Sequence, residues 1–166
     1  FQDDFTTYWG FLAFMLGHTG RLTLSPHFDR TALDPFSQGL AAYYRRRAWR
    51  TPAVLWRMRR TASEYARHFR GWDAVLSPVL AHAVPKLGHL SPEVPFDELF
   101  ARLTRYVAFT PLNNAAGSPA ISLPMGACAN GLPIGVHVSA PHGAERTLLE
   151  LAYELEAAQP FRRITG

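Results

Sequence analysis

The sequence holds few of the residues that build disulfides, metal sites or lysine-rich surfaces. It has 1 cysteine, Cys128, which excludes an internal disulfide and a cysteine-based zinc site and agrees with a cytoplasmic protein. Lys86 is the single lysine, so arginine supplies almost all of the 17 basic residues. An arginine-rich chain also follows from genome base composition, and the net charge of +4 therefore indicates no particular partner.

Secretory and membrane signals are also missing. Residues 1–16 carry Asp3 and Asp4 but no basic residue, and the apolar patch from Tyr8 to Leu16 is too short to span a bilayer. We therefore expect no membrane partner. The first residue is Phe1 rather than Met, so we expect the chain to begin within a longer protein, with trimming as the alternative.

Hydrophobic periodicity predicts that the first part of the chain is helical. Residues 7–17 predict a short buried helix, whereas residues 19–36 carry turn signals and predict a loop. From 37 to 70 an apolar stripe has helical spacing, and Thr51-Pro52 within it suits a helix start, so we expect two helices or one kinked helix. The stripe contains Ala41, Tyr44, Ala48, Thr51, Leu55, Met58, Ala62, Tyr65 and Phe69.

The remainder of the chain mixes short strands with helices. Gly71 is a suitable stop for the preceding helix, and Asn130-Gly131 predicts a turn between two strands. Strands are expected at 72–78, 120–124 and 134–139, a proline-rich loop at 79–95, and helices from Phe96 to Val107 and at about 144–158.

This element order predicts an α/β fold with helices packed on a small mixed sheet of about three strands. We expect residues 1–166 to form one domain or part of one, with a helical part at about 1–71 and a strand and helix part at about 72–160. A sheet this small leaves its edges unpaired, which indicates that a partner segment lies outside the chain.

A run of motifs in the second half of the chain carries a family resemblance. Residues 109–124 read FTPLNNAAGSPAISLP, followed by GLPIGVHVSAP and GAERTLLELAYELE. This succession resembles the C-terminal part of amidase-signature enzymes, where an F-T pair, an N-x-x-G-x-P-A turn, a strand ending in proline, a G-L-P-x-G strand and an E-x-x-L-L helix follow in this order. Residues 72–78 resemble that family's W/Y-D-x-x-L-x-P strand. Each motif alone is weakly specific, and their shared order over about residues 60–160 carries the resemblance.

Local physics gives the N-x-x-G-x-P-A motif a structural role without reference to the family. Gly117 allows a backbone conformation or a close approach that a side chain would block, and Pro119 fixes the entrance to the strand. Asn114 can bond nearby backbone and stabilise a turn. These three residues predict a rigid strand entrance rather than a direct part in chemistry.

The resemblance implies amide hydrolysis, which needs a nucleophile, a base and donors for the oxyanion. It implies a serine nucleophile, a second serine in a cis peptide and a lysine base, with the serines in a Gly/Ser-rich signature. This chain has no Ser-Ser pair, and Lys86 lies in a proline-rich loop downstream of where that lysine belongs. We therefore expect no catalytic residue in this chain, which alone is inactive, and a catalytic N-terminal part of the same amidase as its partner.

Serines and histidines are present, but their contexts do not predict an independent site. Ser77, Ser118 and Ser122 lie in no G-x-S-x-G elbow. The residue after Ser118 is Pro119, which has no backbone N–H to contribute to an oxyanion hole. The closest histidine pairs, His82 with His89 and His137 with His142, lack the i,i+4 spacing of a helical zinc site. We expect no metal and no cofactor.

One position bears on the substrate. In glutamine-using amidotransferase subunits of this family, the resemblance implies an Asp two residues before the F-T pair that recognises the substrate amine. Here that position is Val107, which favours a less polar small-molecule amide; the alternative is that Val107 only buries on its helix. Thr110 and Asn113 are further substrate-pocket candidates because they lie at the helix-to-strand entrance.

Two other functions stay open at this point. One is a non-catalytic binding or structural module with an amidase-like shape. The other is nucleic-acid binding, because residues 43–50 and 57–60 interleave arginines with aromatic residues. We prefer to interpret these arginines as the solvent-facing side of a helix or as partners for carboxylates outside the chain. A homodimer is a further partner that the sequence leaves open.

Overall fold

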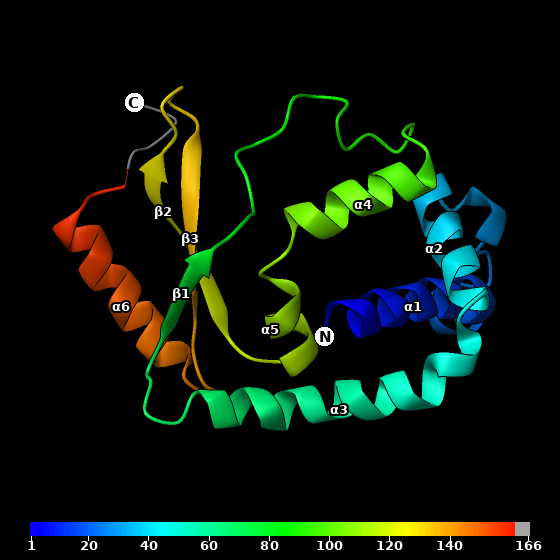
Figure 1. Ribbon diagram of the computed structural model, residues 1–166, viewed down its shortest axis with the longest axis horizontal. Helices are drawn as coiled ribbons and strands as arrows, with labels where there is room; N and C mark the ends of the chain where they lie inside the picture. The colour runs from blue at the N-terminus through cyan, green and yellow to red at the C-terminus, as the bar shows by residue number, and fades with distance from the viewer. Residues whose placement is uncertain (162–166) are drawn as a thin grey trace. The chain divides into compact units, whose positions relative to one another are not determined.

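Six α-helices, two 3-10 turns and three strands follow one another in the computed structural model, which describes residues 1–161 (Figure 1). Residues 1–60 and 86–103 form unit 1, and residues 61–85 form unit 2 with the described residues from 104 onward. Among the residues described, no helix is long and apolar enough to cross a membrane. The α/β class predicted from the sequence is confirmed.

Unit 1 begins with a helix longer than the sequence predicted. Helix α1 (Gln2–Thr23) has 22 residues and extends past both ends of the expected helix at 7–17. The hydroxyls of Thr6 and Thr7 donate to the Asp3 carbonyl at 3.1 and 2.8 Å, and acidic residues in the first turn suit the helix dipole. These polar first-turn residues stabilise a helix without adding to its apolar period, so a search for periodicity placed the start too late.

The expected loop at 19–36 is shorter and more ordered than predicted. It is occupied by the end of α1, the 3-10 turn η1 (Arg30–Ala32) and the start of helix α2 (Pro35–Arg45). Asp34 caps α2, because its carboxylate accepts from the backbone N–H of Ser37 at 3.0 Å. Pro35 follows at the first helical position, which needs no N–H donor.

Of the two alternatives expected for residues 37–70, the structure shows two helices rather than one kinked helix. Helix α2 is followed by the 3-10 turn η2 (Ala48–Arg50) and by helix α3 (Thr51–His68), which includes Thr51 as its first residue rather than as a cap. Tyr44, Met58, Tyr65 and Phe69 of the predicted stripe are buried. Val54, which lies outside that stripe, is 2% exposed and is one of the most buried residues.

Aromatic rings make much of the core of unit 1. Helix α4 (Phe96–Tyr106) contributes Phe96 and Phe100, whose ring centroids lie 5.4 Å apart. The Phe96 ring packs on Phe36, and the Phe100 ring packs on Tyr43 of α2 at 5.0 Å. An added Cβ at Gly39 would meet the Phe96 ring, so this glycine is required for the close approach.

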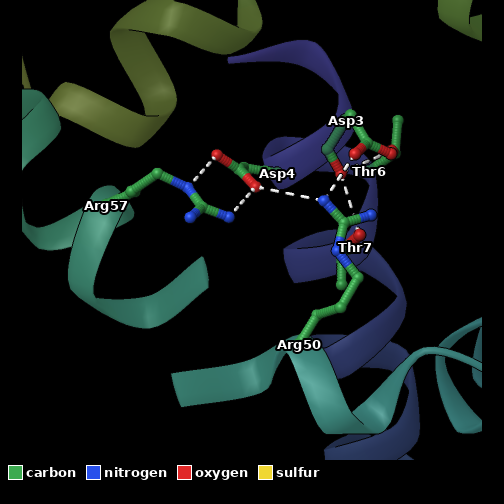
Figure 2. Close-up of polar contacts among 6 residues, drawn as sticks. All are labelled: Asp3, Asp4, Thr6, Thr7, Arg50 and Arg57. Atoms are coloured by element: carbon green, nitrogen blue, oxygen red, sulfur yellow. Dashed lines mark hydrogen bonds and ion pairs between the residues drawn. The ribbon is translucent and has the colours of Figure 1, made fainter. Parts of the chain in front are cut away.

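Three ion pairs join α1 to η2 and the first turns of α3, and all three lie inside unit 1 (Figure 2). Arg57 donates to both Asp4 carboxylate oxygens, through Nε at 2.5 Å and Nη2 at 2.6 Å. Arg50 Nη2 lies 2.6 Å from Asp3 Oδ2. The expectation that these arginines pair outside the chain is therefore wrong for Arg50 and Arg57, whose partners lie 47 and 53 residues away in the same chain.

Unit 2 contains the sheet, in the order β1-β3-β2. Its strands are β1 (Val75–Pro78), β2 (Ala120–Ala127) and β3 (Pro133–Ser139). The predicted number of strands is confirmed, but β1 is shorter than the expected 72–78 and β2 is longer than the expected 120–124. Both pairings are antiparallel, so the sheet is not mixed as predicted, because β3 runs against each of its neighbours.

An apolar core joins this sheet to the last helix. Helix α6 (Glu145–Ala158) lies against one side of the sheet (Figure 1) and buries Leu148 against Leu123, Val138 and Ala140. Val138 and Ala140 are fully buried. The hairpin between β2 and β3 turns at Gly131, whose φ is +81°, as the Asn130-Gly131 pair predicted. The other side of β3 carries the polar side chains of His137 and Ser139.

Candidate functional site

A buried network of polar side chains occupies the side of β3 that faces away from α6. His137 and Ser139 of β3 are 6% and 8% exposed, and both point to this side because they are two residues apart in a strand. Asn113 comes from the short helix α5 (Pro111–Ala116) and Tyr65 from α3. All four residues belong to unit 2.

Asn113 is the hub of this network. Its Nδ2 donates to the Tyr65 hydroxyl at 3.3 Å and to Ser118 Oγ at 3.0 Å. Its Oδ1 accepts from the Ser139 hydroxyl at 3.3 Å. Tyr65 in turn donates to the carbonyl of Ala140 at 3.0 Å. These bonds satisfy a side chain that is 8% exposed, as a buried amide requires.

The turn after α5 fixes the position of Asn113. Gly117 ends the helix in the left-handed conformation with a φ of +68°. The N–H groups of Gly117 and Ser118 donate to the Asn113 carbonyl at 2.8 and 3.2 Å. An added Cβ at Gly117 would have no atom within 4 Å, so its backbone conformation, and not a close approach, explains the glycine.

The sequence assigned the turn to Asn114, and here the structure corrects it. Asn114 lies within α5 and is exposed, whereas its neighbour Asn113 faces the sheet and makes the hydrogen bonds. A six-residue helix turns successive side chains by about 100°, so neighbouring asparagines face different directions. Pro119 stands at the strand entrance as predicted, and its carbonyl accepts from Ala140 N at 3.1 Å.

His137 is the titratable group of the network. Strand register places it directly opposite Ser77 of β1 and Ser122 of β2. Its Nδ1 lies 3.3 Å from Ser77 Oγ and 3.4 Å from Ser139 Oγ. Burial lowers the pKa of His137 below the ordinary value for histidine, which favours the neutral imidazole at pH 7.

This serine–histidine contact is not a complete catalytic triad. Ser77 Oγ also lies 3.2 Å from the carbonyl of Pro78, which competes for its proton. Among residues 1–161 no carboxylate is hydrogen-bonded to His137, so the acidic member of a triad is missing from the described residues. Ser118 receives its bond from Asn113 and lies apart from this contact.

The other predicted pocket residues lie on the segment that leads into α5. Val107 follows the last residue of α4 and is half-buried, so it is not part of the helical stripe from which its burial was predicted. The chain leaves the helix one residue earlier than the apolar spacing suggested. Thr110 occupies the N-cap position of α5, is half-buried, and forms no side-chain cap bond. The assignment of Val107, Thr110 and Asn113 to a substrate pocket stays a prediction.

Sequence reasoning missed Tyr65, His137 and Ser139 as members of one network. Each was assigned to a helix stripe or a strand on apolar spacing alone. The signal that was present is the alternation of His137 and Ser139 with valines in β3, since both sides of a central strand can be buried. Within the described part of the chain, no cluster of three or more His, Cys, Asp or Glu side chains is arranged to hold a metal ion.

Comparison with known proteins places this geometry in a family. The family model described as Amidase matches residues 16–149. The chain is 44% identical over 164 residues to AmiC of Mycobacterium leprae (strain TN), whose name describes it provisionally as an amidase. This match covers 99% of the chain and 35% of that relative, so the chain spans about a third of its length.

A second group of relatives has a named substrate. The chain is 38% identical over 97 residues to the 6-aminohexanoate-cyclic-dimer hydrolase of Pseudomonas sp. (strain NK87), covering 55% of the chain and 20% of that protein. A solved structure of a 6-aminohexanoate cyclic dimer hydrolase, complexed with substrate, superimposes with a TM-score of 0.76 and 26% identity, covering 98% of this chain and 36% of that one. The fold of this chain therefore matches part of a larger enzyme.

Proposed function

This chain belongs to the amidase family, and from that premise we propose that it is the C-terminal segment of an enzyme that hydrolyses carboxylic amide bonds. The observation that carries the proposal is a family match over residues 16–149 in a chain without a Ser-Ser pair or a Gly/Ser-rich run. Its one lysine, Lys86, lies in an exposed loop. The segment supports a catalytic centre whose nucleophile and base lie elsewhere in the protein.

The reaction has two steps. A serine oxygen bonds to the amide carbonyl carbon, the C–N bond breaks, and the amine leaves with a proton passed from that serine through a second serine and a lysine. Water then attacks the acyl-serine ester, which releases the carboxylic acid and restores the serine. Backbone N–H groups stabilise the oxyanion in both steps. None of these groups is assigned to a residue of this chain.

The first role of the segment is to complete a sheet. Strands β1 and β2 each pair with β3 only, so each leaves one edge without a strand partner among the described residues. Unpaired N–H and C=O groups on an edge strand form a template for further pairing. The partner is the catalytic part of the same amidase, and its strands extend this sheet.

The second role is to form a wall of the substrate pocket. The Asn113 side-chain amide is hydrogen-bonded to Tyr65, Ser118 and Ser139, and these bonds hold the turn in place. Val107 and Thr110 precede that turn and are half-buried, which supports their assignment as the residues that contact substrate. Val107 presents an apolar side chain, which suits an aliphatic or aryl amide better than glutamine. Two relatives are named 6-aminohexanoate-cyclic-dimer hydrolases. The substrate in that name is a cyclic aliphatic amide, which agrees with this class.

A chimera tests the proposal directly. This chain is joined to the part of the Mycobacterium leprae relative that lies outside the match, and a panel of aryl and alkyl amides is assayed with the chimera and with this chain alone. We expect turnover and a fluorophosphonate adduct from the chimera only. The control is a chimera in which the labelled serine is replaced by alanine.

Two outcomes contradict the proposal. One is a stoichiometric fluorophosphonate adduct on this chain alone that maps to Ser77, Ser118 or Ser122. The other is a chimera that folds, by circular dichroism and size-exclusion chromatography, but hydrolyses no amide of the panel.

A further inference from the structure

A cavity in unit 1, apart from the polar network described above, has the composition of an anion-binding site. It has a volume of about 460 Å³, which is within the usual range for small-molecule pockets, and lies between α1, η1 and α2. Its lining includes Phe14, Gly17, His18, Arg30, Thr31 and Arg45. A smaller hollow next to it shares Gly17, His18, Arg30 and Thr31.

The charge lining this cavity is unbalanced. Among residues 1–161, neither Arg30 nor Arg45 forms an ion pair with a carboxylate. The single carboxylate on the adjoining hollow is Asp29, whose Oδ1 accepts from the backbone N–H of Thr31 at 2.8 Å and from its hydroxyl at 2.7 Å. Two guanidinium groups and no carboxylate therefore line the cavity itself, although Asp29 lies beside Arg30 at the adjoining hollow. Guanidinium groups pair best with carboxylate or phosphate.

The cavity also has an apolar side. The Phe14 ring stacks on His18 with a centroid distance of 4.0 Å, and the Arg45 guanidinium lies 5.7 Å from the Phe14 ring centroid. Ala13 and Leu33 add further apolar surface. A ligand that fits has an anionic group at the arginines and an apolar body against Phe14, so a bare inorganic anion uses only part of the site.

Gly17 gives an independent sign that the space is kept open. Glycine in a helix interior costs stability relative to alanine, so it needs a reason. In unit 1, Cβ atoms at Gly10, Gly20 and Gly39 would meet Leu40, Phe28 and Phe96, which explains those glycines by packing. At Gly17 a Cβ would meet only Leu33 Cδ1, at 3.9 Å, and φ is not positive. Neither packing nor backbone conformation requires this glycine, and a small residue here keeps the cavity open.

From these observations we infer that the cavity between α1, η1 and α2 binds a small organic carboxylate, with its charge at Arg30 and Arg45 and its apolar body over Gly17 and against Phe14. This inference rests on unit 1 alone and does not depend on the proposed amide hydrolysis. A free carboxylate is distinguished from a phosphate by the need for an apolar body, which inorganic phosphate lacks.

Binding of defined probes to the full chain tests the inference. Benzoate is titrated by isothermal calorimetry and by NMR, beside benzamide as its uncharged counterpart and inorganic phosphate as an anion without an apolar body. We expect saturable benzoate binding with NMR shifts on Gly17 and its neighbours, at least about tenfold weaker binding of benzamide and phosphate, and weaker benzoate binding at high salt.

Matched variants locate the site. Gly17→Phe fills the cavity and should abolish benzoate binding, whereas Gly17→Ala should retain it. Arg45→Gln should weaken binding about tenfold, and Arg46→Gln, on the next residue and outside the cavity, should not. Circular dichroism checks that each variant keeps its helices. Equal binding of benzamide and benzoate, or benzoate binding that survives both Gly17→Phe and Arg45→Gln, overturns the inference.

Discussion

The Asp4 carboxylate accepts two hydrogen bonds from the Arg57 guanidinium, from Nε at 2.5 Å and from Nη2 at 2.6 Å, across 53 residues of sequence (Figure 2). Arg50 lies between the two acidic residues, 2.6 Å from Asp3 and 3.7 Å from Asp4. The hydrogen bonds from Arg50 and Arg57 hold the pKa values of Asp3 and Asp4 below the ordinary value for aspartate. Two-point pairing of this kind fixes the direction of α1 against the start of α3.

This pairing predicts how stability depends on pH. Because the pKa of Asp4 is lowered by folding, its contribution is present above the unfolded value of about 3.9 and is lost as pH falls through the folded value. We expect the free energy of unfolding to decline below about pH 5. Asp4→Asn should lower the free energy of unfolding at pH 7 and flatten that decline, as measured by urea unfolding at a series of pH values.

The matched control for this prediction is Asp73→Asn, at an exposed aspartate without an ion pair. It should leave both the stability at pH 7 and its acid dependence close to those of the unaltered chain. An Asp4→Asn variant with the same pH profile as the unaltered chain would show that the pair adds nothing to folding.

Neighbouring asparagines should respond very differently to the same substitution. Asn113→Ala removes a side chain that bonds Tyr65, Ser118 and Ser139 in a buried site, and we expect a loss of about 2 kcal/mol in the free energy of unfolding. Asn114→Ala, on the exposed side of the same helix, should change it by less than about 0.5 kcal/mol. Urea unfolding at pH 7 measures both, and equal losses would refute the hub role of Asn113.

The hydroxyl of Tyr65 should be energetically coupled to Asn113. Tyr65→Phe keeps the ring that packs on Phe69 but removes the donor to the Ala140 carbonyl and the acceptor for Asn113, at a cost of about 1 kcal/mol. In the double variant with Asn113→Ala the two losses should fall short of additivity by about 0.5 kcal/mol, because only one of the two bonds of the Tyr65 hydroxyl involves Asn113. Strict additivity in a double-mutant cycle would show that the 3.3 Å contact between them carries no energy.

Two glycine-to-alanine substitutions should have opposite signs. At Gly117, where φ is +68°, alanine should lower the free energy of unfolding by about 1 kcal/mol, because an L side chain disfavours this conformation. At Gly17 it should raise the free energy of unfolding by up to about 1 kcal/mol, because the helix gains propensity and the added methyl has space. Thermal or urea unfolding of the two variants measures both changes. A lower free energy of unfolding for Gly17→Ala would mean that Gly17 has a packing role.

The sequence predicted which strongly periodic segments form helices and strands better than it predicted where those segments begin and end. The break before α3, the hairpin at Asn130-Gly131 and the last helix follow from local patterns that the fold keeps. Helix α1 was predicted too short because Thr6 and Thr7 stabilise its first turn through hydrogen bonds to Asp3, which add nothing to apolar spacing. Strand β1 was predicted too long because its start depends on which residues of β3 it can pair with, and pairing begins at Val75 with Ser139.

What the sequence determined by itself was the family, the α/β class, the absence of a Ser-Ser pair and the glycine at position 117, because each depends on residue identity and order along the chain. The tertiary structure decided which of Asn113 and Asn114 faces the sheet, which carboxylates pair with Arg50 and Arg57, and that Gly17 lies at a cavity. These depend on how segments distant in the sequence meet within each unit, and spacing along the chain carries little information on such contacts.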